Sequence, residues 1–330
     1  MTQAFAALVV DKKEEHFSVD IEKKTIQDLP EGEVLIRVHY SGINYKDSLA
    51  SIPNGNIVRT FPFIPGIDLS GVVVSSTDPR FKEGDEVIAT SYEIGVSHFG
   101  GFSEYARIPA KWIVPLPTGL SLKEAMVIGT AGFTAALSVQ SLLDNRVTPK
   151  MGKVLVTGAT GGVGSFAVSI LSRLGFEVEA STGKASAEEY LKTLGAASII
   201  SREKVYDGKI KALGKQNWFA AIDPVGGEPL ASLLSQIQYG GCVAASGLTA
   251  GTKLPTSVFP FILRGISLLG IDSVYTPMDK RIKIWSRLAN DFKPHTIDSF
   301  IQQEVTLEQL PTVLPTLLQG QARGRTIVKL

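Results

Sequence analysis

The stretch "VLVTGATGGVGS", residues Val154–Ser165, places four glycines between an apolar run and a second segment with helical periodicity. A glycine cluster after a buried strand and before a helix lets backbone N–H groups approach a pyrophosphate, whose charge the helix N-terminus favours. Gly161 and Gly164 match the last two glycines of G-x-G-x-x-G, whereas Ala159 stands where the first is expected. A tight turn with a closely packed helix is the alternative. The flanking strand and helix favour dinucleotide binding.

The residues after this loop alternate between strand-like and helix-like segments. "KVLVTG", "GGVGSFAVSILSRLG" and "FEVEAST" form one strand–helix–strand unit. Because neighbouring parallel strands need a crossover, usually a helix, this order predicts a parallel sheet with covering helices. The alternation continues with a helix near 186–196, strands at 197–201 and 218–225, a helix at 229–238 and a strand at 241–247.

The first 120 residues show a different pattern of short strands and glycine- or proline-rich turns. Strands are expected within 33–44, 69–76 and 83–91, which predicts a compact β-rich barrel domain. Ser121 and Glu124 have capping-box spacing at the start of a helix-length apolar segment. The final "RTIVKL" is β-like, and we expect it to return to the first domain.

Length and composition limit the possible functions. A chain of 330 residues predicts two domains, and a net charge of +1 with scattered basic residues argues against nucleic-acid binding. One cysteine, Cys242, excludes an intramolecular disulfide and a multi-cysteine zinc site, and fits a reducing compartment. The first residues lack a basic leader, and no window is expected to span a membrane. We expect a soluble cytoplasmic protein.

Several blocks of the sequence carry a resemblance to a known family. "GATGGVG", "SGINYKD" (41–47), "FPFIPGIDLSG" (61–71), "AIDPVGG" (221–227) and "GGCVAASGL" (240–248) resemble the zinc-free quinone oxidoreductases of the medium-chain dehydrogenase/reductase superfamily. "NYKD", "PFILRG" and "GRTIVKL" look most like the branch that includes acrylyl-CoA reductases. The resemblance implies an α/β fold with a GroES-like β-barrel catalytic domain (1–124 and 297–330), a Rossmann doubly wound parallel-sheet domain (125–296), and a homodimer.

A zinc site is not expected. Related alcohol dehydrogenases use a Gly-His-Glu block where this chain has Gly66, Ile67 and Asp68, and isoleucine cannot coordinate a metal. The four histidines are far apart in sequence, and none has metal-ligand spacing with Cys242. Cys242 follows two glycines in an apolar segment, which favours a core position over a nucleophile.

The resemblance points to Asn44 and Tyr45 as catalytic residues. Hydride addition to a conjugated alkene moves negative charge to the carbonyl oxygen, and tyrosine can donate a hydrogen bond or a proton there. Alternatively, Asn44 caps a turn and Tyr45 is a wall of the nicotinamide site. For Asp47 we favour a place at the start of a short helix over a chemical role.

The end of the strand after the glycine loop indicates a preference for NADP(H). NAD-selective folds carry an acidic residue about 20 positions past the loop. Here that place falls on Ser181 or Thr182, followed by Gly183 and Lys184, which can bind a 2′-phosphate. Glu179 would take the acidic role if the strand ended earlier. Further cofactor contacts implied by the resemblance are Tyr45, Thr160, Gly161, Gly162, Val163, Arg202, Leu248, Ile262, Ser273 and Arg325.

These observations predict an NADPH-dependent reductase of an α,β-unsaturated carbonyl compound or a short enoyl-CoA such as acrylyl-CoA. A quinone reductase is the alternative within enzymes, and a non-catalytic nucleotide-binding protein is the alternative outside them. A coenzyme A handle would require basic residues around the cleft, and the sequence leaves open whether Arg59, Arg264 or others face it.

Overall fold

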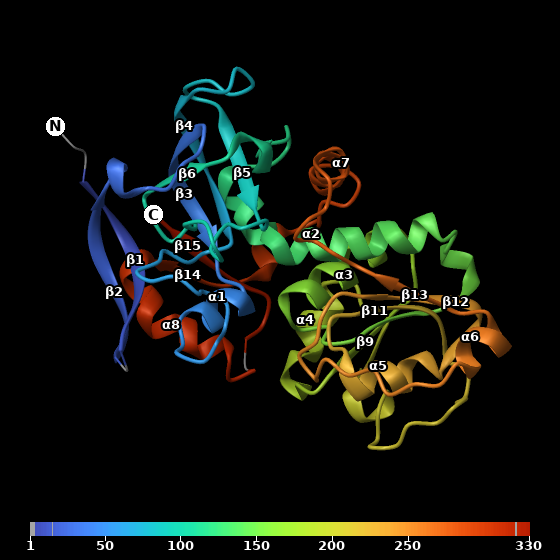
Figure 1. Cartoon of the computed structure of the whole chain (residues 1–330). Coiled ribbons are helices and arrows are strands. Elements are labelled where there is room, and N and C mark those ends of the chain that lie inside the picture. Colours follow the sequence, from blue (N-terminus) through green and yellow to red (C-terminus); the bar gives the residue numbers. More distant parts are fainter. Residues whose placement is uncertain (1–3, 15, 321) are drawn as a thin grey trace. The chain divides into compact units, whose positions relative to one another are not determined.

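The computed structural model describes residues 4–14, 16–320 and 322–330, and these fold into two compact units (Figure 1). The first unit contains the residues up to Thr130 together with Val274–Asn290 and Thr296–Leu330. The second contains Ala131–Ser273 and Asp291–His295. The units therefore differ from the domains expected from the sequence chiefly at 274–290, which joins the first unit.

The second unit is built on a six-stranded parallel sheet of order β10-β9-β8-β11-β12-β13, flanked by helices (Figure 1). This confirms the predicted Rossmann-type sheet. An apolar cluster that includes Leu155, Trp218 and Leu233 packs in its core. The elements are β8 (Val154–Val156), α3 (Gly162–Arg173), β9 (Val178–Thr182), α4 (Glu188–Thr193), β10 (Ser198–Ser201), β11 (Trp218–Asp223), α5 (Gly227–Leu234), β12 (Ile237–Ala245), α6 (Phe259–Arg264) and β13 (Ser267–Gly270).

The first unit contains a seven-stranded sheet of order β14-β15-β3-β4-β5-β7, with β6 paired to β3, and a separate β1-β2 hairpin. As expected, the C-terminal strand returns to this unit, where Ile327 pairs with Gly42. The strands are β1 (Ala4–Lys13), β2 (His16–Thr25), β3 (Val34–Gly42), β4 (Asp68–Ser76), β5 (Glu86–Thr90), β6 (Tyr105–Ile108), β7 (Ile113–Pro115), β14 (Ile301–Thr306) and β15 (Arg325–Lys329), and the helices are α1 (Tyr45–Ala50), α7 (Met278–Leu288) and α8 (Leu310–Leu317).

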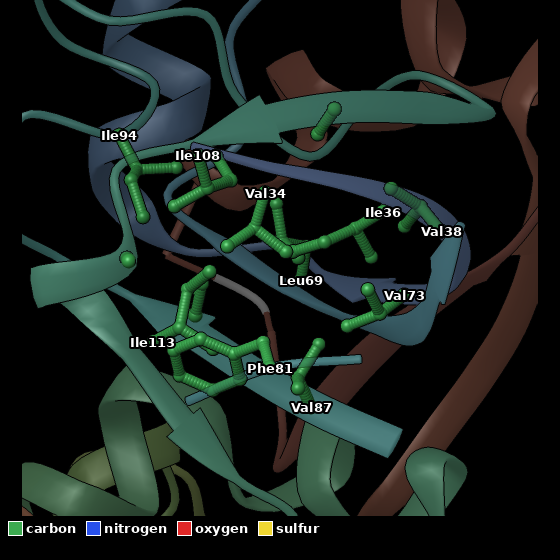
Figure 2. Packing of buried hydrophobic residues seen from close by; sticks show 13 residues of the cluster. Val34, Ile36, Val38, Leu69, Val73, Phe81, Val87, Ile94, Ile108 and Ile113 are labelled. Carbon is green, nitrogen blue, oxygen red and sulfur yellow. The ribbon is translucent and has the colours of Figure 1, made fainter. Parts of the chain in front are cut away.

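Alternation along these strands creates the core of the first unit. Val34, Ile36 and Val38 are two residues apart on β3, so they point to one side of the sheet. Figure 2 shows them packed with Leu69 and Val87 from the neighbouring strands. The period-two pattern seen in the sequence therefore encloses an apolar interior.

Helix α2 (Leu122–Asp144) begins at the predicted capping box, since Ser121 N–H donates to Glu124 Oε2 (2.8 Å) and Glu124 N–H donates to Ser121 Oγ (3.2 Å). It is broken at Gly129, where φ is 49° and ψ is −159°. The expectation that no window could span a membrane was wrong for this helix, which is long and apolar enough. However, 78% of its apolar window is buried inside the protein, so the apolar residues have a packing role.

Helix α7 belongs to the first unit because Arg281 anchors it there. Arg281 Nη1 donates to the carbonyl (3.2 Å) and hydroxyl (3.0 Å) oxygens of Thr90, and the guanidinium lies 4.4 Å above the Tyr92 ring. These partners lie almost two hundred positions away in the chain, so the sequence pattern could not indicate them.

Candidate functional site

The parallel sheet of the second unit brings most of the predicted cofactor residues to one edge. Since the strands are parallel, the segments after their carboxyl ends lie along the same edge. Thr160–Val163 follow β8, Gly183 and Lys184 follow β9, Arg202 follows β10, Leu248 follows β12 and Ser273 follows β13. This is the edge at which open α/β sheets bind their ligands.

Two glycines of the β8–α3 loop have different structural needs. A Cβ on Gly164 would lie 2.4 Å from the Gly158 carbonyl oxygen and 2.7 Å from Ala159 Cα, so this glycine permits close packing of helix and loop. Gly161 is the N-cap of α3 with φ −76°, and its Cβ would meet only ordinary contact at 3.4 Å. Nothing within the second unit requires glycine at 161, which is expected if a ligand approaches there.

The end of β9 carries the predicted hydroxyl groups. The strand ends at Thr182, Ser181 and Thr182 are buried, and Thr182 Oγ1 accepts from Lys184 N–H (3.0 Å). Arg202 lies over Gly183, because a Cβ on Gly183 would be 3.2 Å from Arg202 Cδ and Nε. Thr182, Gly183 and Lys184 border a hollow of about 230 Å³.

Glu179 does not take the acidic role. It lies three residues before the strand end, where its carboxylate accepts hydrogen bonds from Ser198 Oγ (2.7 Å) and Trp218 Nε1 (2.8 Å) and pairs with Lys153. The carboxylates near the hollow are those of Glu188 and Glu203, and Glu203 also accepts from Arg202 Nε (3.2 Å).

In the first unit, Asn44 and Tyr45 form the turn into α1. Asn44 is the N-cap, and its backbone N–H donates to Asp47 Oδ2 (2.7 Å) in a capping box, which agrees with the structural role favoured for Asp47. Tyr45 is the first helical residue, 49% exposed, and its phenol makes no hydrogen bond to a described residue. The hydrogen bond to Asp47 therefore fixes the backbone at Asn44, while the Tyr45 ring stays accessible to solvent.

The Asn44 side chain is occupied by a buried polar network. Its Nδ2 group donates to Asp68 Oδ2 (2.8 Å) and approaches Asp47 Oδ2 and the Gly42 carbonyl (3.3 Å each), while its Oδ1 accepts from Arg325 Nη1 (3.0 Å). The resemblance predicted that Asn44 is a catalytic residue. These contacts instead favour a positioning role, because the side chain is already bonded within the protein.

Arg325 lies at the centre of this network and is 4% exposed. Its guanidinium donates to the carbonyl oxygens of Val127 and Ile43 (3.1 Å each) and lies 3.7 Å from Asp68 Oδ2. Asp68 also accepts from the backbone N–H (2.9 Å) and hydroxyl of Thr130. Burial lowers the pKa of the Arg325 guanidinium, and the nearby carboxylates oppose that shift.

Glycines make room for this buried charge. A Cβ on Gly42 would lie 2.7 Å from Arg325 Nη2, and one on Gly129 would lie 2.8 Å from the same atom and 2.6 Å from Asp68 Oδ2. The break in α2 at Gly129 also turns the Thr130 N–H toward Asp68. The break in α2 therefore makes space for the buried ion pair and also supplies a hydrogen bond to it.

Asp47 is a fully buried carboxyl group beside this ion pair. Its Oδ1 accepts from the Ile67 N–H (2.9 Å) and its Oδ2 from Asn44. Burial, together with the negative charge of Asp68, raises the pKa of Asp47 to about 7. The carboxyl group thus changes charge near neutral pH beneath the turn that carries Tyr45.

Three predicted cofactor residues lie elsewhere, and one of them, Tyr45, begins α1 in the first unit. Ile262 is on α6, and Arg264, two residues later, donates to the carbonyls of Ser235 (2.7 Å) and Ile237 (3.2 Å), which are at the amino end of β12. The structure therefore does not bring Ile262 to the carboxyl edge, and it places Arg325 in the buried network of the first unit. The sequence missed the network's other members, Asp68 and Thr130, although the "GID" block marked Asp68.

Comparison with known proteins agrees with this architecture. Residues 30–118 match the alcohol dehydrogenase GroES-like domain, and residues 162–289 match the zinc-binding dehydrogenase family. The chain is 60% identical over 330 residues to YhfP of Bacillus subtilis, a quinone oxidoreductase by name, and covers 100% of both chains. It is 46% identical over 326 residues to the acrylyl-CoA reductase AcuI of Ruegeria pomeroyi, covering 98% of each.

The chain belongs to the zinc-free quinone oxidoreductase branch of the medium-chain dehydrogenase/reductase superfamily. Solved structures of the branch superpose closely on it. The crystal structure of YhfP with NAD bound has a TM-score of 0.98 and covers 100% of both chains. The YhdH oxidoreductase from Salmonella enterica in complex with NADP has a TM-score of 0.95 at 46% identity, covering 98% of this chain and 99% of the other. The chain is accordingly an oxidoreductase.

The donor groups near Asn44 do not fit the zinc ion for which one matching family is named. Ile67 is buried and has no donor atom in its side chain, and Asn44 is bonded to Arg325 and Asp68. In the described ranges, no three His, Cys, Asp or Glu side chains are grouped so that they could hold a metal. Cys242 lies in the core on β12, where burial raises the pKa of its thiol to about 11.

Proposed function

We propose that the protein is an NADPH-dependent reductase of the conjugated C=C bond of an α,β-unsaturated carbonyl compound or a short enoyl-CoA. One observation carries this proposal: Tyr45 offers a phenol that no described residue engages, on a turn whose other polar groups are already bonded and which lacks metal ligands. The 46% identical relative named acrylyl-CoA reductase supports the substrate class.

The residues of the second unit fit the cofactor. Backbone N–H groups of Gly162 and Val163 at the start of α3 bind the pyrophosphate, and Gly161 allows its approach. The Ser181 and Thr182 hydroxyls, Lys184 and Arg202 bind the ribose 2′-phosphate by hydrogen bonds and charge. The NADP-bound relative supports this choice, whereas the 60% identical relative was solved with NAD bound.

The residues of the first unit act on the substrate. The bound nicotinamide supplies a hydride for the β-carbon of the alkene. As negative charge moves to the carbonyl oxygen, the Tyr45 phenol donates a hydrogen bond to it and lowers the barrier. Asn44, fixed by Arg325 and Asp68, holds the tyrosine in place. Solvent provides the proton that the α-carbon finally takes.

A quinone reductase is the second candidate, because the 60% identical relative carries that name. Oxidation of NADPH by the purified protein with acrylyl-CoA, methyl vinyl ketone and benzoquinone separates the two. We expect the highest kcat/KM with an alkene conjugated to a carbonyl. Turnover of benzoquinone alone would establish the second candidate, and NADPH binding without turnover of any of the three would establish a non-catalytic protein.

Two variants test Tyr45. Tyr45→Phe removes the hydroxyl and is expected to lower kcat about 10²-fold, the usual range for a positioned acid or donor. Tyr45→Ala also removes the ring and is expected to raise the KM for NADPH. Wild-type kcat and KM in both variants would remove Tyr45 from the mechanism.

We also propose that the protein is a cytoplasmic homodimer. Strand β13 is the last strand at one edge of the sheet, and α6 and the residue before it expose Val258, Phe259, Ile262 and Leu263. An open strand edge beside exposed apolar side chains is typical of a surface that a second copy covers. Light scattering of wild type and Ile262→Asp tests this, with a shift to monomer expected. The single buried thiol suits a reducing compartment.

A further inference from the structure

The first unit contains a hollow beside the last turn of α1. It has a volume of about 250 Å³. Leu49 and Ala50 of α1 form one wall, and Val58 and Phe61 of the following loop form another. This is smaller than the roughly 300–1,000 Å³ of sites that enclose a whole drug-sized ligand, so it would take part of a longer molecule.

Two cations line this hollow, and no described residue supplies a counter-charge to either. Lys12 and Arg59 line it and are exposed, and neither side chain has an ion pair or hydrogen bond with any residue in the described ranges. The nearest acid in sequence, Asp11, already accepts from the Lys12 backbone N–H (2.8 Å) and pairs with Lys13 (3.2 Å). The hollow therefore combines some apolar side chains with unneutralised positive charge.

Arg264, unlike Arg59, is bonded to backbone carbonyl groups of the protein. Its guanidinium donates to the carbonyl oxygens of Gly214 (2.6 Å), Ser235 (2.7 Å) and Ile237 (3.2 Å). Those bonds fix α6 within the second unit and engage both terminal nitrogens of the guanidinium. Of the two arginines that the sequence names as possible contacts for a coenzyme A handle, Arg59 is the one whose side chain bonds to no described residue.

We propose that the hollow binds the phosphate-bearing pantetheine arm of an acyl-CoA thioester substrate, with its apolar walls against the arm and with Lys12 and Arg59 at the phosphates. This rests on the proposed function. Helix α1 separates Tyr45 from the hollow. Tyr45 is its first residue and Ala50, which lines the hollow, is its last, so the helix is about 9 Å long at 1.5 Å per residue. An extended pantetheine arm is longer than this helix, so it can reach across that distance between thioester and phosphate.

The charges match this ligand. An arginine fork forms paired hydrogen bonds with phosphate oxygens, and a lysine adds a point charge. Inorganic phosphate and a nucleotide offer the same anion, but they lack the arm that Leu49, Val58 and Phe61 would contact. Affinity for coenzyme A should therefore exceed that for pantetheine, which lacks the phosphate, and that for phosphate, which lacks the arm.

Steady-state kinetics with two substrates test the proposal on the full chain. The Lys12→Ala/Arg59→Ala variant is expected to raise the KM for acrylyl-CoA about tenfold with kcat unchanged, and to leave the KM for methyl vinyl ketone, which has no handle, as in wild type. Lys23→Ala/Arg80→Ala removes the same charge from the first unit outside the hollow, so it controls for the net field. An equal change for both substrates, or none for acrylyl-CoA, overturns the proposal.

Calorimetric titration separates this inference from the proposed function. Wild type should bind free coenzyme A more tightly than pantetheine or inorganic phosphate, and the double variant should lose about tenfold in affinity for coenzyme A alone. If no alkene is reduced but coenzyme A binds through these residues, the proposed function fails and the site stands. If alkenes are reduced and coenzyme A binds equally to wild type and variant, the site fails and the function stands.

Discussion

The two units use polar groups in opposite ways. In the first unit, Asp47, Asp68 and Arg325 are buried, and Asn44 bonds to all three while backbone groups supply several of their other hydrogen bonds. This network fixes the backbone that carries Tyr45. In the second unit, Lys184 and Arg202 follow the ends of β9 and β10, and Lys184 borders a hollow. A buried network resists rearrangement, whereas groups at a sheet edge can bind a ligand. The comparison separates residues that should affect stability from residues that should affect binding.

Arg325→Ala should have the largest effect on the first unit. It would leave the Asp68 carboxylate without its ion pair and Asn44 Oδ1 without a donor in a buried site, which costs about 3–5 kcal/mol of unfolding free energy. Urea denaturation measures this loss. Arg80→Ala is the control, because its pair with Asp78 lies at the surface, where solvent screens it, and its loss should change stability little. Equal losses in the two variants would contradict a structural role for the network.

Gly129→Ala should destabilise the first unit by about 2–4 kcal/mol. Its φ and ψ lie in a region open mainly to glycine, and the new methyl group would collide with Asp68 and Arg325. The same denaturation experiment measures the loss. Full stability would show that the helix break is not needed to accommodate the ion pair.

Asp47 should make the stability of the first unit depend on pH. Because its folded pKa is raised, it contributes stability that is fully present below about pH 4 and is lost as the pH rises through about 7. Asp47→Asn cannot accept from both the Asn44 and Ile67 N–H groups, so it should lose about 1–3 kcal/mol near pH 4. That difference from wild type should shrink towards pH 8. A difference independent of pH would show that Asp47 does not titrate in this range.

Gly161→Ala should affect binding and not stability. The added methyl group meets only ordinary contact and φ is already negative, so the unfolding free energy should stay within about 0.5 kcal/mol. The Kd for NADPH should rise about tenfold, because the methyl group holds the pyrophosphate away from the loop. Fluorescence titration measures the Kd. An unchanged value would make this glycine a feature of the turn alone.

Lys184→Ala should produce the smallest effect. We expect kcat/KM with NADPH to fall several-fold, about 1 kcal/mol, and kcat/KM with NADH to stay the same, because only the 2′-phosphate needs the charge. Parallel kinetics with both cofactors measure the ratio. A proportional loss with both would assign Lys184 to a part of the nucleotide that they share.

Much of the second unit could be predicted from local sequence. The parallel sheet, the glycine loop and the position of Ser181 and Thr182 at the end of β9 follow from short-range periodicity and turn chemistry, and the structure has them. The extent of the first unit was less predictable, because α7 joins it through contacts between Arg281 and residues far away in sequence.

The sequence by itself determined the order of strands and helices, the pattern of the nucleotide loop, and Ile67 where metal-dependent relatives carry a ligand. Only the tertiary structure decided what Asn44 does and which arginine is available to an anion. Asn44 meets Arg325 across 281 positions, and Thr130 meets Asp68 across 62. Contacts over such separations leave no trace in local periodicity, because they depend on how strands pair and where a helix breaks. An arginine can therefore belong to a buried ion pair, as Arg325 does, anchor a helix, as Arg281 does, or bond to no described residue, as Arg59 does. The tertiary structure decides which.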